Sequence, residues 1–229
     1  MVIQTEFDIT SWLDLFLQRL TDLFGSRLCF FGIQGSYGRG EPTRDSDIDV
    51  VVIVDGMDHH DLLAYRNMID KMDHSDKICG FVCGTAELCA WEKSDLLQLV
   101  LDTRAIVGSL DSLGLSFTRE DVHRAVHTGA CTVYHASSHN LLHARNREAL
   151  VGLYKAARFT VRMKYYYDTG DYIASFRELA DVVSGEDRDV LAMASSMAIG
   201  LQDYDFDEYS LRLVDWAAGV LREIGQERP

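Results

Sequence analysis

The chain has 229 residues, a length that suits one large domain or two small ones. Its 36 acidic and 22 basic residues give a formal net charge of −14, and 47% of its residues are hydrophobic. This is the composition of an ordinary globular protein, and it excludes disordered, collagen-like and coiled-coil chains. An acidic surface repels phosphate backbones, so general nucleic-acid binding is disfavoured and a cationic partner is favoured.

The first ten residues lack the basic and apolar regions of a secretory signal, and no apolar run approaches the roughly 18 residues of a membrane span. The five cysteines lack the spacing of a small disulfide scaffold. We therefore expect a cytoplasmic protein that binds no membrane, with reduced and mostly buried thiols.

The first half of the chain mixes helix and strand patterns. Apolar residues at helical spacing predict a helix over 8–24, and the apolar run after it predicts a buried strand over 27–34. A polar, glycine-rich loop then leads to the clearest strand, over 47–54. Further elements are predicted as a helix over 58–72, a strand over 77–84, a helix over 95–103 and a strand over 105–110.

The second half is almost entirely helical in pattern. Between residues 119 and 224 the helical periodicity is broken by turn residues at 169–170, 184–185 and 203–207. The sequence therefore predicts an α+β protein, with a small mixed-sheet domain over 1–115 followed by a helical bundle over 116–229.

Two acidic residues stand at the head of the predicted strand over 47–54. Side chains two apart in a strand project from the same face, so Asp47 and Asp49 are expected to lie together. Adjacent carboxylates repel each other unless a cation lies between them. Magnesium, which prefers carboxylate and phosphate oxygens, is the expected occupant.

The loop before this strand has the composition of a phosphate-binding turn. Gly35 and two further glycines allow the backbone to turn tightly and to approach a ligand closely. Backbone N–H groups at such a turn can bind an anion, the Ser36 hydroxyl adds a donor, and Arg39 and Arg44 add positive charge. A phosphate-binding turn beside two metal-binding carboxylates predicts a site for a metal–nucleoside triphosphate.

At these residues the sequence resembles the polymerase-β-like nucleotidyltransferase superfamily. The resemblance is carried by Gly35-Ser36, Arg39-Gly40 and Ser46-Asp47-Ile48-Asp49-Val50, which match a G-S, R-G and S-D-x-D signature. The helical second half looks like the bundle of aminoglycoside (kanamycin-type) nucleotidyltransferases and of HEPN-like proteins. The resemblance implies a nucleotidyltransferase catalytic domain followed by a substrate-binding-like helical domain.

The resemblance also implies a reaction. A nucleoside monophosphate would pass from an NTP, with ATP as the first choice, to a hydroxyl of a small molecule, and pyrophosphate would leave. Two Mg²⁺ ions held by Asp47, Asp49 and a third acid would grip the triphosphate. Gly35 and Ser36 would bind its phosphates, and the acidic balance of the chain suits an aminoglycoside-like acceptor.

The third acid departs from the family pattern, in which it lies on the following strand. The strand predicted over 77–84 contains no carboxylate. Asp76, just before it, and Glu87, just after it, are the available substitutes. We prefer Asp76 as the third catalytic carboxylate.

Basic residues recur on one predicted helix of the second half. Lys155, Arg158 and Arg162 share a helix face that could close over the triphosphate. The competing interpretation is a solvated stripe paired with acids. We take Lys155 and Arg158 as nucleotide-binding candidates and Glu148 as one candidate general base.

Histidines and a cysteine recur at steps of four between residues 123 and 143, a spacing at which helical side chains can bind zinc. Thr128-Gly129 is expected to interrupt this helix. We therefore interpret the run as partly buried histidines and not as metal ligands.

Two other functions stay open. A protein adenylyltransferase of the antitoxin type would modify a Tyr, Ser or Thr hydroxyl of a partner protein. A nucleotide-binding module without turnover would follow if the third acid is missing. The oligomeric state is also open, a homodimer included.

Overall fold

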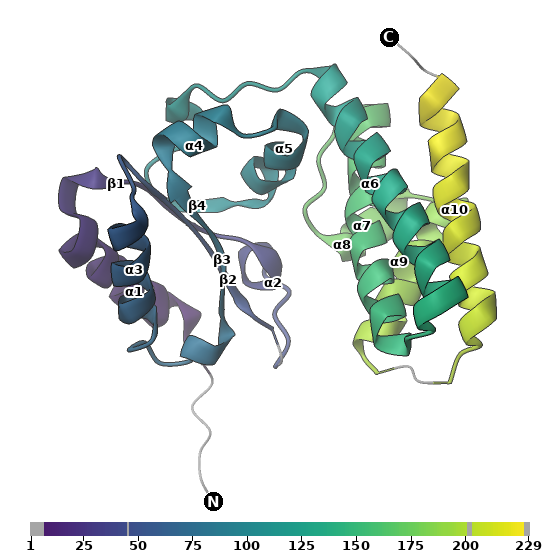
Figure 1. Ribbon diagram of the computed structural model, residues 1–229, viewed down its shortest axis with the longest axis horizontal. Helices are drawn as coiled ribbons and strands as arrows, with labels where there is room; N and C mark the ends of the chain where they lie inside the picture. The colour runs from purple at the N-terminus through teal and green to yellow at the C-terminus, as the bar shows by residue number, and fades with distance from the viewer. Residues whose placement is uncertain (1–6, 45, 201–202, 227–229) are drawn as a thin grey trace, which may run out of the picture. The chain divides into compact units, whose positions relative to one another are not determined.

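The computed structural model describes residues 7–44, 46–200 and 203–226. The chain forms two compact units, one of residues 1–92 and 99–116 and the other of residues 93–98 and 117–229 (Figure 1). The predicted division after residue 115 had placed residues 93–98 in the first domain. No helix in the described ranges has both the length and the apolar character to cross a membrane.

The first unit is built on a mixed sheet, which confirms the predicted α+β class. Its strands are β1 (Leu28–Ile33), β2 (Ile48–Val54), β3 (Ile78–Gly84) and β4 (Arg104–Val107), in the order β3-β2-β1-β4. β2 and β3 run parallel, whereas β1 is antiparallel to both β2 and β4. The two central strands are apolar along almost their whole length, because helices cover the sheet.

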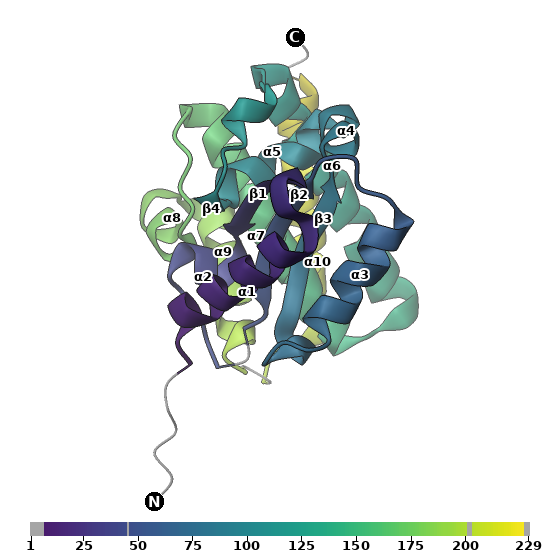
Figure 2. The ribbon, with the colours of Figure 1, turned by 90° about the vertical axis from the view of Figure 1, so that its left-hand side faces the viewer.

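Two helices cover one face of this sheet, as Figures 1 and 2 show. α1 (Ile9–Phe24) and α3 (His59–Ile69) contribute apolar side chains to a single core with β1 and β2. Within it the Phe16 ring stacks on Phe31 with centroids 5.5 Å apart. The predicted helices over 8–24 and 58–72 are therefore confirmed, with shorter limits.

The sequence analysis did not predict the short helices of the first unit. α2 (Gly35–Arg39) occupies the expected glycine-rich loop, and α4 (Thr85–Ala90) was not expected. α5 (Lys93–Asp102), whose residues 93–98 belong to the second unit, begins two residues before its predicted start. Single turns of 3₁₀ helix also form at η1 (Gly25–Arg27), η2 (Ser75–Lys77) and η3 (Asp111–Leu113). Helices of five or six residues are too short to show a helical period.

The second unit is a bundle of helices, as predicted. Its elements are α6 (Arg119–His139), the single π turn η4 (Asn140–Ala144), α7 (Arg147–Thr169), α8 (Phe176–Val182), α9 (Gly185–Ala198) and α10 (Phe206–Gln226). α6 packs against α7 and α10, and α7 packs against α9. The sequence predicted no break between α6 and α7, but Asn140 and Asn146 exchange two hydrogen bonds of 3.0 Å that close a turn there.

The predicted interruption at Thr128-Gly129 is wrong, because α6 runs unbroken through both residues. A Cβ placed at Gly129 would lie 2.5 Å from Oγ1 of Thr160 on α7. The glycine therefore lets the two helices approach closely. Among the described residues, no group of three histidine, cysteine, aspartate or glutamate side chains is arranged to hold a metal ion.

Arg162 is also not part of a solvated stripe. Its side chain is fully buried in the second unit, and its guanidinium donates a 2.8 Å hydrogen bond to the carbonyl of Ala174. The rings of Phe159, Tyr172 and Phe176 lie around it, with centroids 4.6–5.2 Å from the guanidinium carbon. A hydrogen bond and cation–π contacts stabilise this charge in the interior.

The expectation of mostly buried thiols is wrong as well. Cys79, Cys89 and Cys131 are exposed, Cys29 is half-buried, and only Cys83 is buried; none of them is in a disulfide. Burial raises the pKa of the Cys83 thiol to about 12, so that this thiol stays protonated at neutral pH.

Candidate active site

The start of α2 is attached to the head of β2. The backbone N–H of Gln34, the residue between β1 and α2, donates a 2.8 Å hydrogen bond to the carbonyl of Asp49. Gly35 follows with φ of 64°, and a Cβ at this position would lie 1.9 Å from Oδ2 of Asp49. The Asp49 carboxylate therefore lies directly against the Gly35 backbone. The Gly-Ser turn and the acidic pair therefore lie next to each other through the contact between Gly35 and Asp49, as the sequence predicted.

The two acids of the pair have different surroundings. Asp49 is the second residue of β2 and is half-buried, whereas Asp47 precedes the strand by one residue and is exposed. The strand thus begins one residue later than predicted. Because they are two residues apart at the head of one strand, the carboxylates still belong to the same face.

The loop that carries Asp47 is held by local hydrogen bonds. The Ser46 hydroxyl accepts from the backbone N–H of Thr43 at 2.8 Å, and the backbone N–H of Ser46 donates to the Thr43 carbonyl at 3.1 Å. The Lys77 ammonium donates to the carbonyl of Arg44 at 2.6 Å, which ties the loop to the residue before β3. The Arg44 residue itself is exposed.

Arg39, a predicted nucleotide ligand, forms a buried ion pair inside the first unit. Its Nη1 lies 2.8 Å from Oδ2 of Asp102 at the end of α5, and the two side chains are 9% and 4% exposed. Its Nε lies 3.8 Å from Oε2 of Glu41. A pair this buried fixes α2 on α5, since separating the partners would leave a charge in the interior. The predicted contact between Arg39 and a nucleotide stays a prediction and would have to coexist with this pair.

The third carboxylate is not on the strand beside the pair. β3 lies parallel to β2, with Ile48 opposite Ile78 and Asp49 opposite Cys79. Asp76 lies before the strand in η2 and is exposed; its role as a third ligand stays a prediction.

Glu87, the alternative third ligand, is at the wrong end of the sheet. It lies in α4, which follows Gly84, and Gly84 pairs with Val54. Five residues of strand separate Val54 from Asp49, which is roughly 16 Å. Glu87 is therefore too far along the sheet to share an ion with Asp49.

The remaining candidates belong to the second unit. Lys155 is exposed on α7, and Glu148 is exposed in the first turn of the same helix. Arg158 is half-buried, with its guanidinium carbon 4.5 Å from the centroid of the Phe176 ring. Their predicted roles toward nucleotide and acceptor stay predictions.

Sequence reasoning missed two residues at this site. Asp102 went unnoticed because it lies 63 positions from Arg39 along the chain. Cys79 was passed over as a core thiol, although aligning the first residues of the strands predicted over 47–54 and 77–84, which the structure shows to be parallel, would have placed it beside Asp49. The position of Cys79 could therefore have been predicted from the sequence, whereas the pairing of Asp102 with Arg39 could not.

Comparison with known proteins identifies the part of the chain that carries this geometry. Residues 13–83 match the family model described as "Nucleotidyltransferase domain". Among solved structures, spectinomycin adenyltransferase AAD(9) from Enterococcus faecialis, crystallised with ATP and spectinomycin, is similar in fold. That match has a TM-score of 0.64 and 14% identity, and it covers 94% of this chain and 100% of the other. The search of curated proteins gave no match.

Proposed function

We propose that the protein transfers a nucleoside monophosphate from Mg²⁺–ATP to a hydroxyl of an aminoglycoside-like small molecule, because residues 13–83 match the nucleotidyltransferase domain model. The observation that carries the proposal is the contact between the Asp49 carboxylate and the Gly35 backbone. It joins the acidic pair to the Gly-Ser turn, the two halves of a metal–triphosphate site. The fold similarity to an adenyltransferase crystallised with ATP and spectinomycin favours ATP and this class of acceptor.

The donors at this site suit magnesium. In proteins Mg²⁺ is commonly bound by one or two carboxylates, with phosphate oxygens and water completing its shell. Asp47 and Asp49 supply two carboxylates on one strand face, and both retain solvent access. When bound, the ion would neutralise charge on the triphosphate and stabilise the attacking and leaving oxygens.

The residues of the chain would position the reactants. Asp49, fixed by the sheet, would hold its carboxylate at the start of α2, where Gly35 and Ser36 would bind the phosphates. The acceptor oxygen would form a bond to the α-phosphorus while the bond to the bridging oxygen of pyrophosphate breaks. The hydroxyl proton would pass to a carboxylate, for which Glu148 is a candidate. Positioning of this kind supplies a large part of the rate of phosphoryl transfer.

The test is product formation by the full-length protein. Mg²⁺–ATP is incubated with spectinomycin, streptomycin or kanamycin, and the adenylylated antibiotic is sought by mass spectrometry together with pyrophosphate release. Asp49→Asn is expected to lower the rate by on the order of 100-fold or more. Asp14→Asn, which changes an exposed acid on α1, is the matched control and is expected to keep the rate. Absence of product with every acceptor would reject the proposed acceptor class.

One observation favours a second function. Within the described ranges no third acid joins Asp47 and Asp49 in a group that could hold a metal ion. A nucleotide-binding module without turnover is therefore the second candidate. Calorimetry distinguishes the two, because the module would bind Mg²⁺–ATP tightly and release no pyrophosphate with any acceptor.

A further inference from the structure

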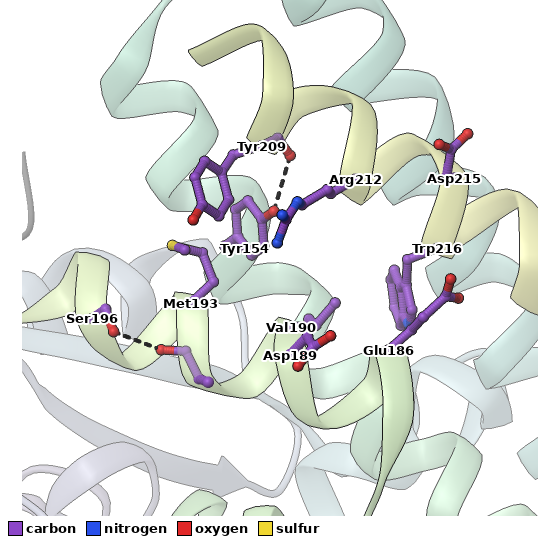
Figure 3. A pocket seen from close by; sticks show the side chains of 11 residues that line it. Tyr154, Glu186, Asp189, Val190, Met193, Ser196, Tyr209, Arg212, Asp215 and Trp216 are labelled. Atoms are coloured by element: carbon purple, nitrogen blue, oxygen red, sulfur yellow. Dashed lines mark hydrogen bonds between the residues drawn. The ribbon is translucent and has the colours of Figure 1, made fainter. Parts of the chain in front are cut away.

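The helical unit contains a cavity of its own. It has a volume of about 540 Å³ and lies between α7, α9 and α10, and Figure 3 shows the side chains that line it. This volume falls within the range of sites that bind small molecules. Every residue that lines the cavity belongs to the second unit, so the cavity is defined without reference to Asp47 or Asp49.

Aromatic rings form part of the wall. Tyr154 and Trp216 are each only 2% exposed, and both line the cavity together with Tyr209. The Tyr154 hydroxyl donates to the carbonyl of Tyr209 at 2.9 Å, and Nε1 of Trp216 donates to Oδ1 of Asp187 at 2.8 Å. Tyr154 and Trp216 therefore form the packed apolar wall of the cavity, and the Tyr209 ring already has the guanidinium carbon of Arg212 5.1 Å from its centroid.

Carboxylates supply the charge of the cavity. Glu186, Asp189 and Asp215 line it and are exposed, and none of them has a hydrogen bond or ion pair to another described side chain. Arg212 is the one cation among the described lining residues, and its Nη2 lies 2.6 Å from Oε1 of Glu208. Glu208, which does not line the cavity, neutralises the positive charge of Arg212. The negative charge of the three lining acids is therefore not neutralised by Arg212.

These surroundings select the chemistry of an occupant. A metal ion needs several oxygen ligands converging on one point, and the described part of the chain has no such group. The three lining carboxylates attract organic ammonium groups, and the apolar wall favours a hydrocarbon frame between those groups. We propose that the cavity between α7, α9 and α10 binds a small organic cation that carries two or more ammonium groups on an apolar frame.

The experiment uses the full-length protein and a probe of defined charge. p-Xylylenediamine, an aromatic dication, is titrated by calorimetry, with the uncharged 1,4-benzenedimethanol as a control of similar shape. The diamine is expected to bind with a sub-millimolar Kd that weakens as salt is raised, and the diol is expected not to bind. Equal binding of both compounds would overturn the proposal.

Variants locate the binding site. Asp189→Asn combined with Asp215→Asn is expected to weaken diamine binding by about tenfold, because each change removes one charge from the cavity. Asp171→Asn combined with Asp181→Asn removes the same two charges from exposed positions that do not line the cavity, and is expected to change Kd by less than about twofold. Similar weakening in all variants would show attraction to the acidic surface in general and would reject the site.

The site is expected to work apart from nucleotidyl transfer. The Asp49→Asn variant should bind the diamine with unchanged Kd, whether or not the protein has the proposed activity. Loss of diamine binding in that variant, with its thermal stability retained, would place the probe at the acidic pair and contradict the proposal. Melting curves of every variant check that the bundle is intact.

Discussion

Asp49 and Cys79 stand opposite each other in the register of the parallel strands β2 and β3, so their side chains leave the same face of the sheet. The Cys79 residue is exposed and Asp49 is half-buried. A thiol therefore occupies the position on the neighbouring strand that is nearest to the acidic pair.

A carboxylate at position 79 should strengthen cation binding. Cys79→Asp would add a third acid next to Asp49, and we expect binding of Mn²⁺, used as a probe, to tighten about tenfold. Cys131→Asp is the matched control, because it adds the same charge at an exposed cysteine of α6. Loss of the free Mn²⁺ signal in electron paramagnetic resonance measures both. An equal effect in the two variants would indicate only a more acidic surface.

Gly35→Ala should disturb the Asp49 carboxylate. The added methyl would lie 1.9 Å from Oδ2, so the carboxylate must move. We expect nucleotidyl transfer to fall on the order of 100-fold, the typical effect of misplacing a reacting group by about 1 Å. Gly56→Ala imposes a similar backbone strain, with φ of 58°, but its Cβ meets nothing within 4 Å. Equal activity of the two variants would show that the contact has no role in the reaction.

Arg39→Ala should lower stability more than a change at another arginine of the same segment. It leaves the buried Asp102 carboxylate without this partner, which typically costs about 3–5 kcal/mol. Arg44→Ala, at an exposed position, should stay within about 0.5 kcal/mol of the wild type. Urea unfolding at neutral pH measures both changes. If the two variants unfold alike, the ion pair does not hold α2 in place.

Gly129→Ala should destabilise the helical unit by about 1–3 kcal/mol, because the new methyl would overlap Thr160 on α7. Gly152→Ala is the control; its Cβ meets nothing within 4 Å, and the helix propensity of alanine should add up to about 1 kcal/mol. Adding Thr160→Ala to Gly129→Ala should restore part of the loss. Thermal unfolding tests the order of these variants, and an unchanged melting temperature for Gly129→Ala would contradict the tight packing.

Acid should remove one stabilising interaction of the first unit. Hydrogen bonds of 2.7 and 2.8 Å from Arg27 hold the pKa of Asp61 at about 2, below its usual 3.8. Because the folded state binds this proton less readily, the contribution is complete above about pH 4 and is lost as the pH falls toward 2.

The variant Asp61→Asn should therefore be less stable than the wild type between pH 5 and 7, and the difference should shrink as the pH falls through 2. Asp22→Asn changes an exposed acid of α1 and should show no such pH dependence. Urea midpoints across this range measure the difference. A gap between wild type and Asp61→Asn that is as large at pH 2 as at pH 7 would exclude the titration of Asp61 as its cause.

The sheet and the acidic pair could be predicted because both depend on short-range patterns. β1 and β2 are continuous apolar runs, and the two-residue period of a strand places Asp47 and Asp49 together. The position of Asp49 against Gly35 also followed, since the strand–turn–strand order leaves the ends of the two strands adjacent.

The features that the sequence did not reveal concern residues whose partners lie elsewhere along the chain. A glycine in a helical pattern can mark a break or a close helix contact, and only the packing of Thr160 against α6 decides this for Gly129. An arginine is exposed by default, so the burial of Arg39 and Arg162 depended on partners that no local pattern names.

The aromatic enclosure of Arg162 has a consequence for the connection between α7 and α8. Tyr172 and Ala174 belong to that connection, and both contact the guanidinium from outside the two helices. If this connection detached from the bundle, the Arg162 guanidinium would either lose these partners while it stayed buried or become exposed to water together with the interior around it. Release of the connection is therefore coupled to melting of the bundle itself, and this surface segment should resist proteases as well as the helices that it joins.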